Sequence, residues 1–184
     1  MVQAVGGSAA LKIRASSITH KTEAGGVRLA VDADAAAQAY EEIIDSANAF
    51  DPTAVIDGVE VQEMVPAGVE MLLGVTSDDQ LGPILTVGLG GVFTEVLNDI
   101  AMRPVPISRL DAEAMLSELK GVAVLGQFRG RPAVDREALI EAMLGLSTFA
   151  DLTRDRHPEI ELNPLVVGTN GQGALAVDLV MSMQ

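Results

Sequence analysis

The sequence contains no cysteine and no tryptophan, and aromatic residues make up only 3% of its 184 residues. The absence of cysteine excludes disulfide bonds, thiolate nucleophiles and cysteine-based metal sites. Because bulky aromatic side chains are so few, the core must be built from Ala, Val, Leu, Ile and Met, and hydrophobic residues do make up 48% of the chain. This composition is typical of an ordinary globular α/β or α+β protein and not of a disordered chain.

Basic residues are also scarce, with 12 Lys and Arg against 26 Asp and Glu, which gives a formal net charge of −14. An acidic surface repels nucleic acid, so we expect no nucleic-acid partner, and any phosphate site must be built locally from a few cations and backbone amides. No apolar run approaches the roughly 20 residues that span a bilayer. No signal-peptide pattern follows Met1. We therefore expect a soluble, cytoplasmic protein without a membrane partner.

Hydrophobic periodicity and turn residues divide the chain into strands and helices. Strands are expected at residues 9–15, 27–31, 59–65, 69–78, 83–91, 160–167 and 174–181. Helices are expected at 32–50, 111–119 and 135–152, capped by Asp32 and Asp34, by Asp111 and by Asp135 respectively. The segment 92–107 is compatible with strand or helix, and its Val, Phe, Thr and Ile favour strand.

The last two expected strands are joined by Asn170-Gly171, a dipeptide that favours a tight hairpin. The character of the chain changes at Gly58, before a series of β-like runs. These elements suit an α/β or α+β protein, built as one domain or as two small lobes.

The segment GLGGVF, which begins at Gly88, suggests a phosphate-binding loop but fits no dinucleotide fingerprint, since Phe93 stands at the third glycine position. No lysine follows, as a Walker loop would require. Two interpretations remain open. The backbone of Gly88, Gly90 and Gly91 approaches phosphates closely, or the glycines form a tight turn without a ligand.

Several isolated polar residues each have a structural and a functional interpretation. Lys12 in an apolar strand either ends in solvent or contacts a phosphate. His20, in a polar glycine-containing loop, is either idle or accepts a phosphoryl group. Glu63 and Glu70, on either side of a turn, either keep edge strands soluble or bind the ribose of a nucleotide. His157 is expected to be a loop residue without a chemical role.

Polar side chains interrupt the two closing apolar strands. Glu161 and Asn163 are two residues apart in one strand and share a face. The hairpin would bring Asp178 of the next strand close to them. Asn163 alone is explained as a strand-end cap, but an amide and a carboxylate buried together in paired apolar strands lack partners. Hard oxygen atoms that converge beside phosphates predict a Mg²⁺ site.

The chain contains five distinctive segments in the order LKIRASSITHKTEAGGVRLAV, VQEMVPAGVEMLLGV, GPILTVGLGGVFTEVLNDIAMR, FRGRPAVD and ELNPLVV. In this order they resemble the ATP-grasp part of the ADP-forming (NDP-forming) acyl-CoA synthetases, relatives of succinyl-CoA synthetase. The resemblance runs from Ala10 to Met181. It implies an α+β ATP-grasp fold of mainly antiparallel sheets flanked by helices. In this fold a partial small lobe, residues 1–57, and a large lobe, residues 58–184, clamp ATP.

The resemblance also implies roles for individual residues in nucleotide binding. Lys12 matches the strand lysine that contacts the phosphates, and Lys21 and Thr22 lie with His20 in the loop that closes over them. The glycine loop spans Gly88 to Gly91.

On the base and ribose side, Glu63 corresponds to the hinge position near adenine and Glu70 to the carboxylate that takes the ribose. Glu95 lies just beyond the glycine loop. Asn163 and Asp178 match the magnesium ligands.

Members of this family make acyl-CoA from a carboxylate, CoA and ATP through an acyl phosphate and a phosphohistidine. The main phosphohistidine lies on another domain, and His20 compares with a second histidine that relays the phosphoryl group in some members. The resemblance thus implies Mg²⁺, ATP as substrate, partner domains that bind CoA and carry the phosphohistidine, and an oligomeric full enzyme. It assigns no role to Arg129 or Arg131.

The chain also departs from the family pattern. It lacks a further stretch before the strand lysine, so an N-terminally truncated grasp domain is expected, and the CoA-binding domains are absent. We therefore expect that the chain alone does not complete the reaction. Two alternatives stay open: another ATP-grasp ligase that acts on a carboxylate, and a non-catalytic nucleotide-binding or assembly subunit.

Overall fold

The computed structural model describes residues 1–18, 20–91, 98–128 and 130–183. The chain forms two compact units, Met1–Met64 and Val65–Gln184. The first unit ends later than the boundary expected between residues 57 and 58, because strand β3 (Ile56–Glu63) pairs with strand β1 (Ser8–Ala15) and so belongs to the first unit.

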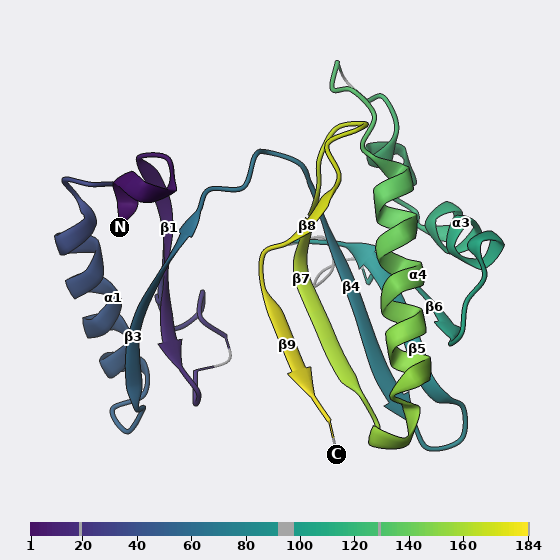
Figure 1. Ribbon diagram of the computed structural model, residues 1–184, viewed down its shortest axis with the longest axis horizontal. Coiled ribbons are helices and arrows are strands. Elements are labelled where there is room, and N and C mark those ends of the chain that lie inside the picture. The colour runs from purple at the N-terminus through teal and green to yellow at the C-terminus, as the bar shows by residue number, and fades with distance from the viewer. Residues whose placement is uncertain (19, 92–97, 129, 184) are drawn as a thin grey trace. The chain divides into compact units, whose positions relative to one another are not determined.

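The first unit is a three-stranded antiparallel sheet with one helix on it (Figure 1). After the 3-10 turn η1 (Val2–Val5) come β1 (Ser8–Ala15), β2 (Val27–Asp32), α1 (Ala36–Phe50) and β3, and the strand order is β2-β1-β3. The buried side of α1 carries Ala39, Ile43 and Ala47, spaced four apart as one helix face requires. They pack in one cluster with Leu11 and Ile13 of β1.

The second unit is a six-stranded antiparallel sheet with helices on one face (Figure 1). The order across the sheet is β6-β5-β4-β7-β8, and β9 also pairs with β7. Its elements are β4 (Val69–Asp78), β5 (Gly82–Leu89), β6 (Ile100–Pro104), α3 (Arg109–Glu118), η2 (Val122–Leu125), α4 (Arg136–Leu152), η3 (Arg154–Arg156), β7 (Glu159–Val167), β8 (Ala174–Ala176) and β9 (Leu179–Ser182).

The core of this unit lies between the sheet and the two helices. Met71 and Leu73 of β4 and Leu85 and Val87 of β5 are fully buried in one cluster with side chains from both helices, among them Met115, Leu116, Leu139 and Met143. Alternation along each strand directs one set of side chains to this core and the other set to the opposite face of the sheet. The α+β architecture of antiparallel sheets flanked by helices is therefore confirmed.

The helix starts test the expected caps. Asp135 is the N-cap of α4, and its side chain accepts the Ala138 N–H, as predicted. Asp111 is not the cap of α3: Ser108 is, and Asp111 completes a capping box with it. For α1 the predicted caps are also wrong, because the helix begins after Ala35, which makes no side-chain cap.

Two other expectations change in detail. The strand expected at 174–181 is broken into β8 and β9 at Val177 and Asp178. Of the strand favoured at 92–107, residues 92–97, Glu95 among them, lie outside the described residues, and in the described part, 98–107, the strand is Ile100–Pro104. No helix in the described ranges is long and apolar enough to cross a membrane.

Gly145 gives a test of the helix assignment. It is exposed in the interior of α4, and a Cβ added there would meet nothing within 4 Å. Alanine costs less backbone entropy than glycine in a helix, so we expect Gly145→Ala to raise the free energy of unfolding by about 1 kcal/mol. Urea denaturation measures the change.

Gly121→Ala is the matched control for this substitution. Its added Cβ would lie 2.2 Å from Cδ1 of Leu89, so we expect a loss of stability there. A fall in stability for Gly145→Ala would contradict the helix assignment at this position.

Candidate functional site

The structure brings Glu70 of β4 against the end of β5. The backbone N–H of Gly90 donates to the Glu70 carbonyl oxygen at 2.7 Å. A Cβ added to Gly90 would lie 2.8 Å from the Glu70 carbonyl carbon, and one added to Gly91 would lie 3.5 Å from Oε2 of Glu70. Only glycine therefore allows β5 to end this close to Glu70, and the Glu70 carboxylate lies beside Gly91.

Gly88 is also required by packing. Its added Cβ would lie 2.8 Å from Cγ2 of Ile100 and 2.9 Å from the carbonyl oxygen of Asp99. Close approach of neighbouring backbone thus explains both Gly88 and Gly90, which is what the interpretation as a turn without a ligand requires. A phosphate role for the glycine loop stays a prediction.

The closing hairpin places Asn163 and Asp178 opposite each other. The Asn163 backbone N–H donates to the Asp178 carbonyl oxygen at 3.3 Å, and the Val177 N–H donates to the Pro164 carbonyl oxygen at 3.0 Å. On the side-chain level, Nδ2 of Asn163 donates to Oε1 of Glu161 at 3.0 Å. The three residues that the sequence singled out therefore lie together, where the partner strand breaks between β8 and β9.

The burial of this pair differs from expectation. Asn163 is exposed and Asp178 is half-buried, whereas the sequence analysis placed both in buried strands. The reason is that β7 directs Ile160, Leu165 and Val167 to the face that α3 and α4 cover, and Asn163 to the opposite face. No buried side-chain nitrogen or oxygen among the described residues lacks a hydrogen-bond partner, so the argument from unsatisfied buried groups is wrong.

The chemistry of these residues nevertheless fits Mg²⁺. With Nδ2 of Asn163 bonded to Glu161, the amide presents its oxygen, and Asp178 adds a carboxylate. Both are the hard oxygen donors that Mg²⁺ takes, usually in small number beside water and phosphate. Across the part of the chain that the structure describes, no cluster of three or more His, Cys, Asp and Glu forms a metal cage. Asn163 and Asp178 would thus supply two ligands and leave the other positions to water and phosphate.

The remaining predicted residues belong to the first unit. Lys12 is only 7% exposed, and it lies in β1 between β2 and β3, on the sheet face opposite the helix-facing Leu11 and Ile13. The interpretation that Lys12 ends in solvent is therefore wrong.

The loop after β1 is closed by backbone bonds. The Ala24 N–H donates to the His20 carbonyl at 3.2 Å, the Gly25 N–H to that of Thr22 at 3.0 Å, and the Gly26 N–H to that of Lys21 at 2.7 Å. His20 and Thr22 are exposed, and Lys21 is half-buried. Glu63, at the end of β3, is exposed opposite Ala9.

Two buried carboxylates accept backbone N–H groups of distant segments in a way that the sequence analysis did not predict. Asp99 lies just before β6 and accepts the N–H groups of Lys120 at 2.7 Å and Gly121 at 2.8 Å. The signal available in the sequence for this role was an isolated aspartate, Asp99, immediately before β6. Asp135 was recognised only as a helix cap, although it also accepts the N–H groups of Gly171 and Gly173, at 2.9 Å each.

The bonds to Asp135 stabilise its charge. Hydrogen bonds from the N–H groups of Gly173, then of Ala138 and Gly171, hold the pKa of the Asp135 carboxyl below its ordinary value. Because the folded pKa is depressed, the stabilisation is complete above the ordinary pKa near 4 and is lost as the pH falls through the folded value.

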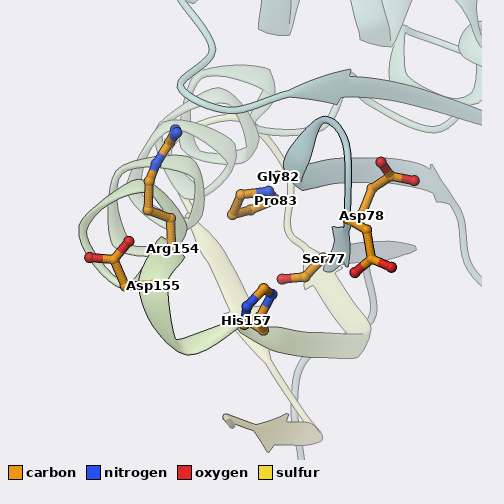
Figure 2. A pocket seen from close by; sticks show the side chains of 8 residues that line it. Ser77, Asp78, Gly82, Pro83, Arg154, Asp155 and His157 are labelled. Carbon is orange, nitrogen blue, oxygen red and sulfur yellow. The ribbon is translucent and has the colours of Figure 1, made fainter.

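Two other features of the second unit lie apart from the predicted nucleotide residues. A shallow cavity of about 270 Å³ at the other end of β4 and β5 is lined by Ser77, Asp78, Asp79, Gly82, Pro83, Arg154, Asp155 and His157 (Figure 2). None of the predicted nucleotide or metal residues lines it. In the FRGRP segment, the backbones of Phe128 and Arg131 exchange two hydrogen bonds across a tight turn, and Arg129 lies outside the described residues.

Comparison with known proteins agrees with this architecture. A family model described as "ATP-grasp domain" matches residues 1–183. The beta subunit of acetate–CoA ligase [ADP-forming] II from Pyrococcus furiosus is 36% identical over 95% of this chain and 74% of its own length. Acetate–CoA ligase [ADP-forming] I from Archaeoglobus fulgidus is 34% identical over 98% of this chain, which spans only 26% of that protein.

Solved structures give the same result. An acetyl-coenzyme A synthetase from Ca. Korarchaeum cryptofilum, in complex with coenzyme A and Ca-AMPCP, superposes with a TM-score of 0.92 at 34% identity. The match covers all of this chain and 79% of the synthetase chain. The chain belongs to the ATP-grasp domain family and corresponds to part of the ATP-grasp module of the ADP-forming acyl-CoA synthetases.

Proposed function

We propose that this chain handles the nucleotide in an enzyme that joins a carboxylate to CoA, converts ATP to ADP and phosphate, and works through an acyl phosphate and a phosphohistidine. The observation that carries the proposal is the pairing of Asn163 with Asp178 on the closing hairpin, in a chain whose relatives are ADP-forming acetate–CoA ligases. The CoA-binding and phosphohistidine domains lie on another chain or on another part of the same protein. The full enzyme assembles as a cytoplasmic oligomer.

In this proposal Asn163 and Asp178 hold Mg²⁺ through one amide and one carboxylate oxygen, and Glu161 orients the amide through its bond to Nδ2. When bound, the ion neutralises phosphate charge and polarises the γ-phosphoryl group. Glu70 binds the ribose hydroxyls with its carboxylate beside Gly91. Glu63 lies near the adenine.

The phosphates are positioned by cations and by backbone. Lys12, held in the centre of its sheet, offers a point charge, and Lys21 and Thr22 contribute from the loop after β1. The Gly90 N–H is already bonded to the Glu70 carbonyl. Among the amides at the end of β5, we therefore assign the phosphate contact to Gly91. Fixed charges and amides of this kind accelerate phosphoryl transfer by orientation and electrostatic stabilisation.

His20 receives the phosphoryl group. A ring nitrogen attacks the γ-phosphorus of ATP, a P–N bond forms as the P–O bond to ADP breaks, and the ring loses a proton to solvent. The exposure of His20 supports this assignment, because a relay must meet a second acceptor. The phosphoryl group then passes to the phosphohistidine domain and on to the carboxylate.

Radiolabelled ATP tests the relay. The chain is mixed with a partner chain that carries the CoA-binding domains, and acid-labile label on protein is measured after a single turnover. We expect His20→Ala to abolish the relayed label on the partner, since alanine has no ring nitrogen to accept the phosphoryl group. Thr22→Ala in the same loop is the matched control, with a smaller expected loss.

The outcomes of this experiment are separable. Label on the partner that is unchanged by His20→Ala would rule out the relay while leaving nucleotide handling intact. No label on either chain, with the parent sequence and MgATP, would contradict the proposed function itself.

A further inference from the structure

The turn between β7 and β8 is fastened to the segment before α4. One carboxylate oxygen of Asp135, Oδ2, accepts the N–H groups of Gly171 and Gly173, and the other, Oδ1, accepts the Ala138 N–H at the start of the helix. The backbone adds two bonds: the Asp135 N–H donates to the Gly168 carbonyl at 2.9 Å, and the Asn170 N–H donates to that of Ala133 at 3.1 Å. Asp135 is only 7% exposed.

The turn has bonds of its own, from the Gly168 N–H to the Gly173 carbonyl at 3.0 Å and from the Gln172 N–H to that of Thr169 at 2.8 Å, but its glycines leave it flexible without a further restraint. It contains Gly168, Gly171 and Gly173, and the last two have a φ of +84°. Flexible, glycine-rich segments allow pairing to slip, and a slip of one residue turns every side chain to the other face of a sheet. In the observed register Leu165 pairs with Ala176, which puts Asp178 opposite Asn163. After a one-residue slip, Val177 or Leu179 would stand there.

We propose that Asp135 is a positioning residue for the metal site. Its carboxylate fixes the register of the β7–β8 hairpin by binding two amides of the turn, and so holds Asp178 opposite Asn163. The inference rests on the proposed function for the part that concerns the metal. The part that concerns the register stands on the backbone geometry alone.

The substitution Asp135→Ser separates the two functions of the carboxylate. Serine is a good helix N-cap and keeps a bond to Ala138, but its side chain is too short and has only one oxygen, so it cannot also hold the turn amides. Asp135→Asn is a milder second variant, because its single amide oxygen can serve the turn or the helix but not both.

The β4–β5 turn at the other end of the sheet provides the control. There Oδ1 of Asp78 accepts the N–H groups of Gln80 and Leu81, at 2.8 Å each. Asp78→Ala therefore removes the same number of carboxylate-to-amide bonds from a β-turn that is remote from Asn163 and Asp178.

Two readouts are measured on the full chain. Amide hydrogen exchange by NMR follows the N–H of Val177, which reports the register without any ligand. Titration with Mn²⁺ and ADP, followed by electron paramagnetic resonance, reports the metal site. For Asp135→Ser we expect faster exchange at Val177 and Mn²⁺–ADP affinity about tenfold weaker, the effect typical of an outer residue that orients a ligand. Asp78→Ala should leave both values at those of the parent.

Each result decides a separate point. Unchanged exchange at Val177 in folded Asp135→Ser and Asp135→Asn would overturn the register role. Changed exchange with unchanged Mn²⁺–ADP affinity would overturn the positioning role. If Asn163→Ala and Asp178→Ala also bind Mn²⁺–ADP as the parent does, the proposed metal site itself is wrong, and the exchange data still decide whether Asp135 sets the register.

Discussion

Removal of either proposed metal ligand is expected to weaken MgATP binding by roughly 100-fold, since a direct ligand should count for at least as much as the outer residues that orient it. The variants are Asn163→Ala and Asp178→Ala, and isothermal titration calorimetry with MgATP measures the affinity. Asp178→Ala should have the larger effect because it removes a full negative charge from the ion. Neither change should unfold the chain, because Asn163 is exposed and Asp178 only half-buried.

The same strand supplies a control. Glu159 is an exposed carboxylate at the start of β7, four residues before Asn163 on the same side of the strand, so Glu159→Ala tests whether any loss of negative charge from this surface matters. We expect parent-like affinity from it. With EDTA in place of Mg²⁺, the difference between Asp178→Ala and the parent should disappear. Parent-like MgATP affinity in both ligand variants would remove the metal assignment.

Local patterns predicted the strands well and the helix caps less well. The bounds expected for 69–78 match β4 residue for residue, because Pro66-Ala67-Gly68 and the turn at Asp78-Asp79 mark its two ends. At α3 two good capping residues, Ser108 and Asp111, lie three apart, and the capping-box pattern decides for the first of them. That information was present in the sequence, and the prediction of Asp111 overlooked it.

The prediction of the candidate site rested on two expectations. The pairing of Asn163 with Asp178 is correct, but the burial of their side chains is not. The hairpin predicted at Asn170-Gly171 does bring Asp178 opposite Asn163, because this dipeptide favours a tight turn. The exposure of Asn163 could not be predicted, since it depends on which sheet face the helices cover. That the site binds a nucleotide was inferred from the resemblance to a family and not from the spacing of residues.

The role of Asp135 shows why the rest of the site lay beyond sequence reasoning. Its bond to Ala138 lies within the three residues that a capping pattern covers, and this part was predicted. Its bonds to Gly171 and Gly173 join positions 36 and 38 residues apart, so no local pattern contains them. The same holds for the contact of Gly90 with Glu70, which is made only when β5 lies beside β4.

Gly90→Ala is expected to lower both stability and nucleotide affinity. The added Cβ would lie 2.8 Å from the Glu70 carbonyl carbon, 2.9 Å from its oxygen and 3.0 Å from its Cβ. The carbonyl carbon and oxygen belong to the backbone and Cβ is bonded to it, so no side-chain rotation relieves the clash. Such overpacking costs about 1–3 kcal/mol, which urea denaturation measures. Gly126→Ala is the control, because its nearest neighbour would lie at 3.6 Å, an ordinary contact.

The effect on nucleotide binding can be separated from the effect on stability. To accommodate the methyl group, the start of β4 must move, and the Glu70 carboxylate moves with it. If Glu70 binds the ribose, Gly90→Ala lowers ATP affinity in the parent background but not in a Glu70→Ala background, whereas the loss of stability persists in both. An equal loss of affinity in the two backgrounds would show that Gly90 acts on the nucleotide independently of Glu70. The glycine loop would then contact the ligand directly.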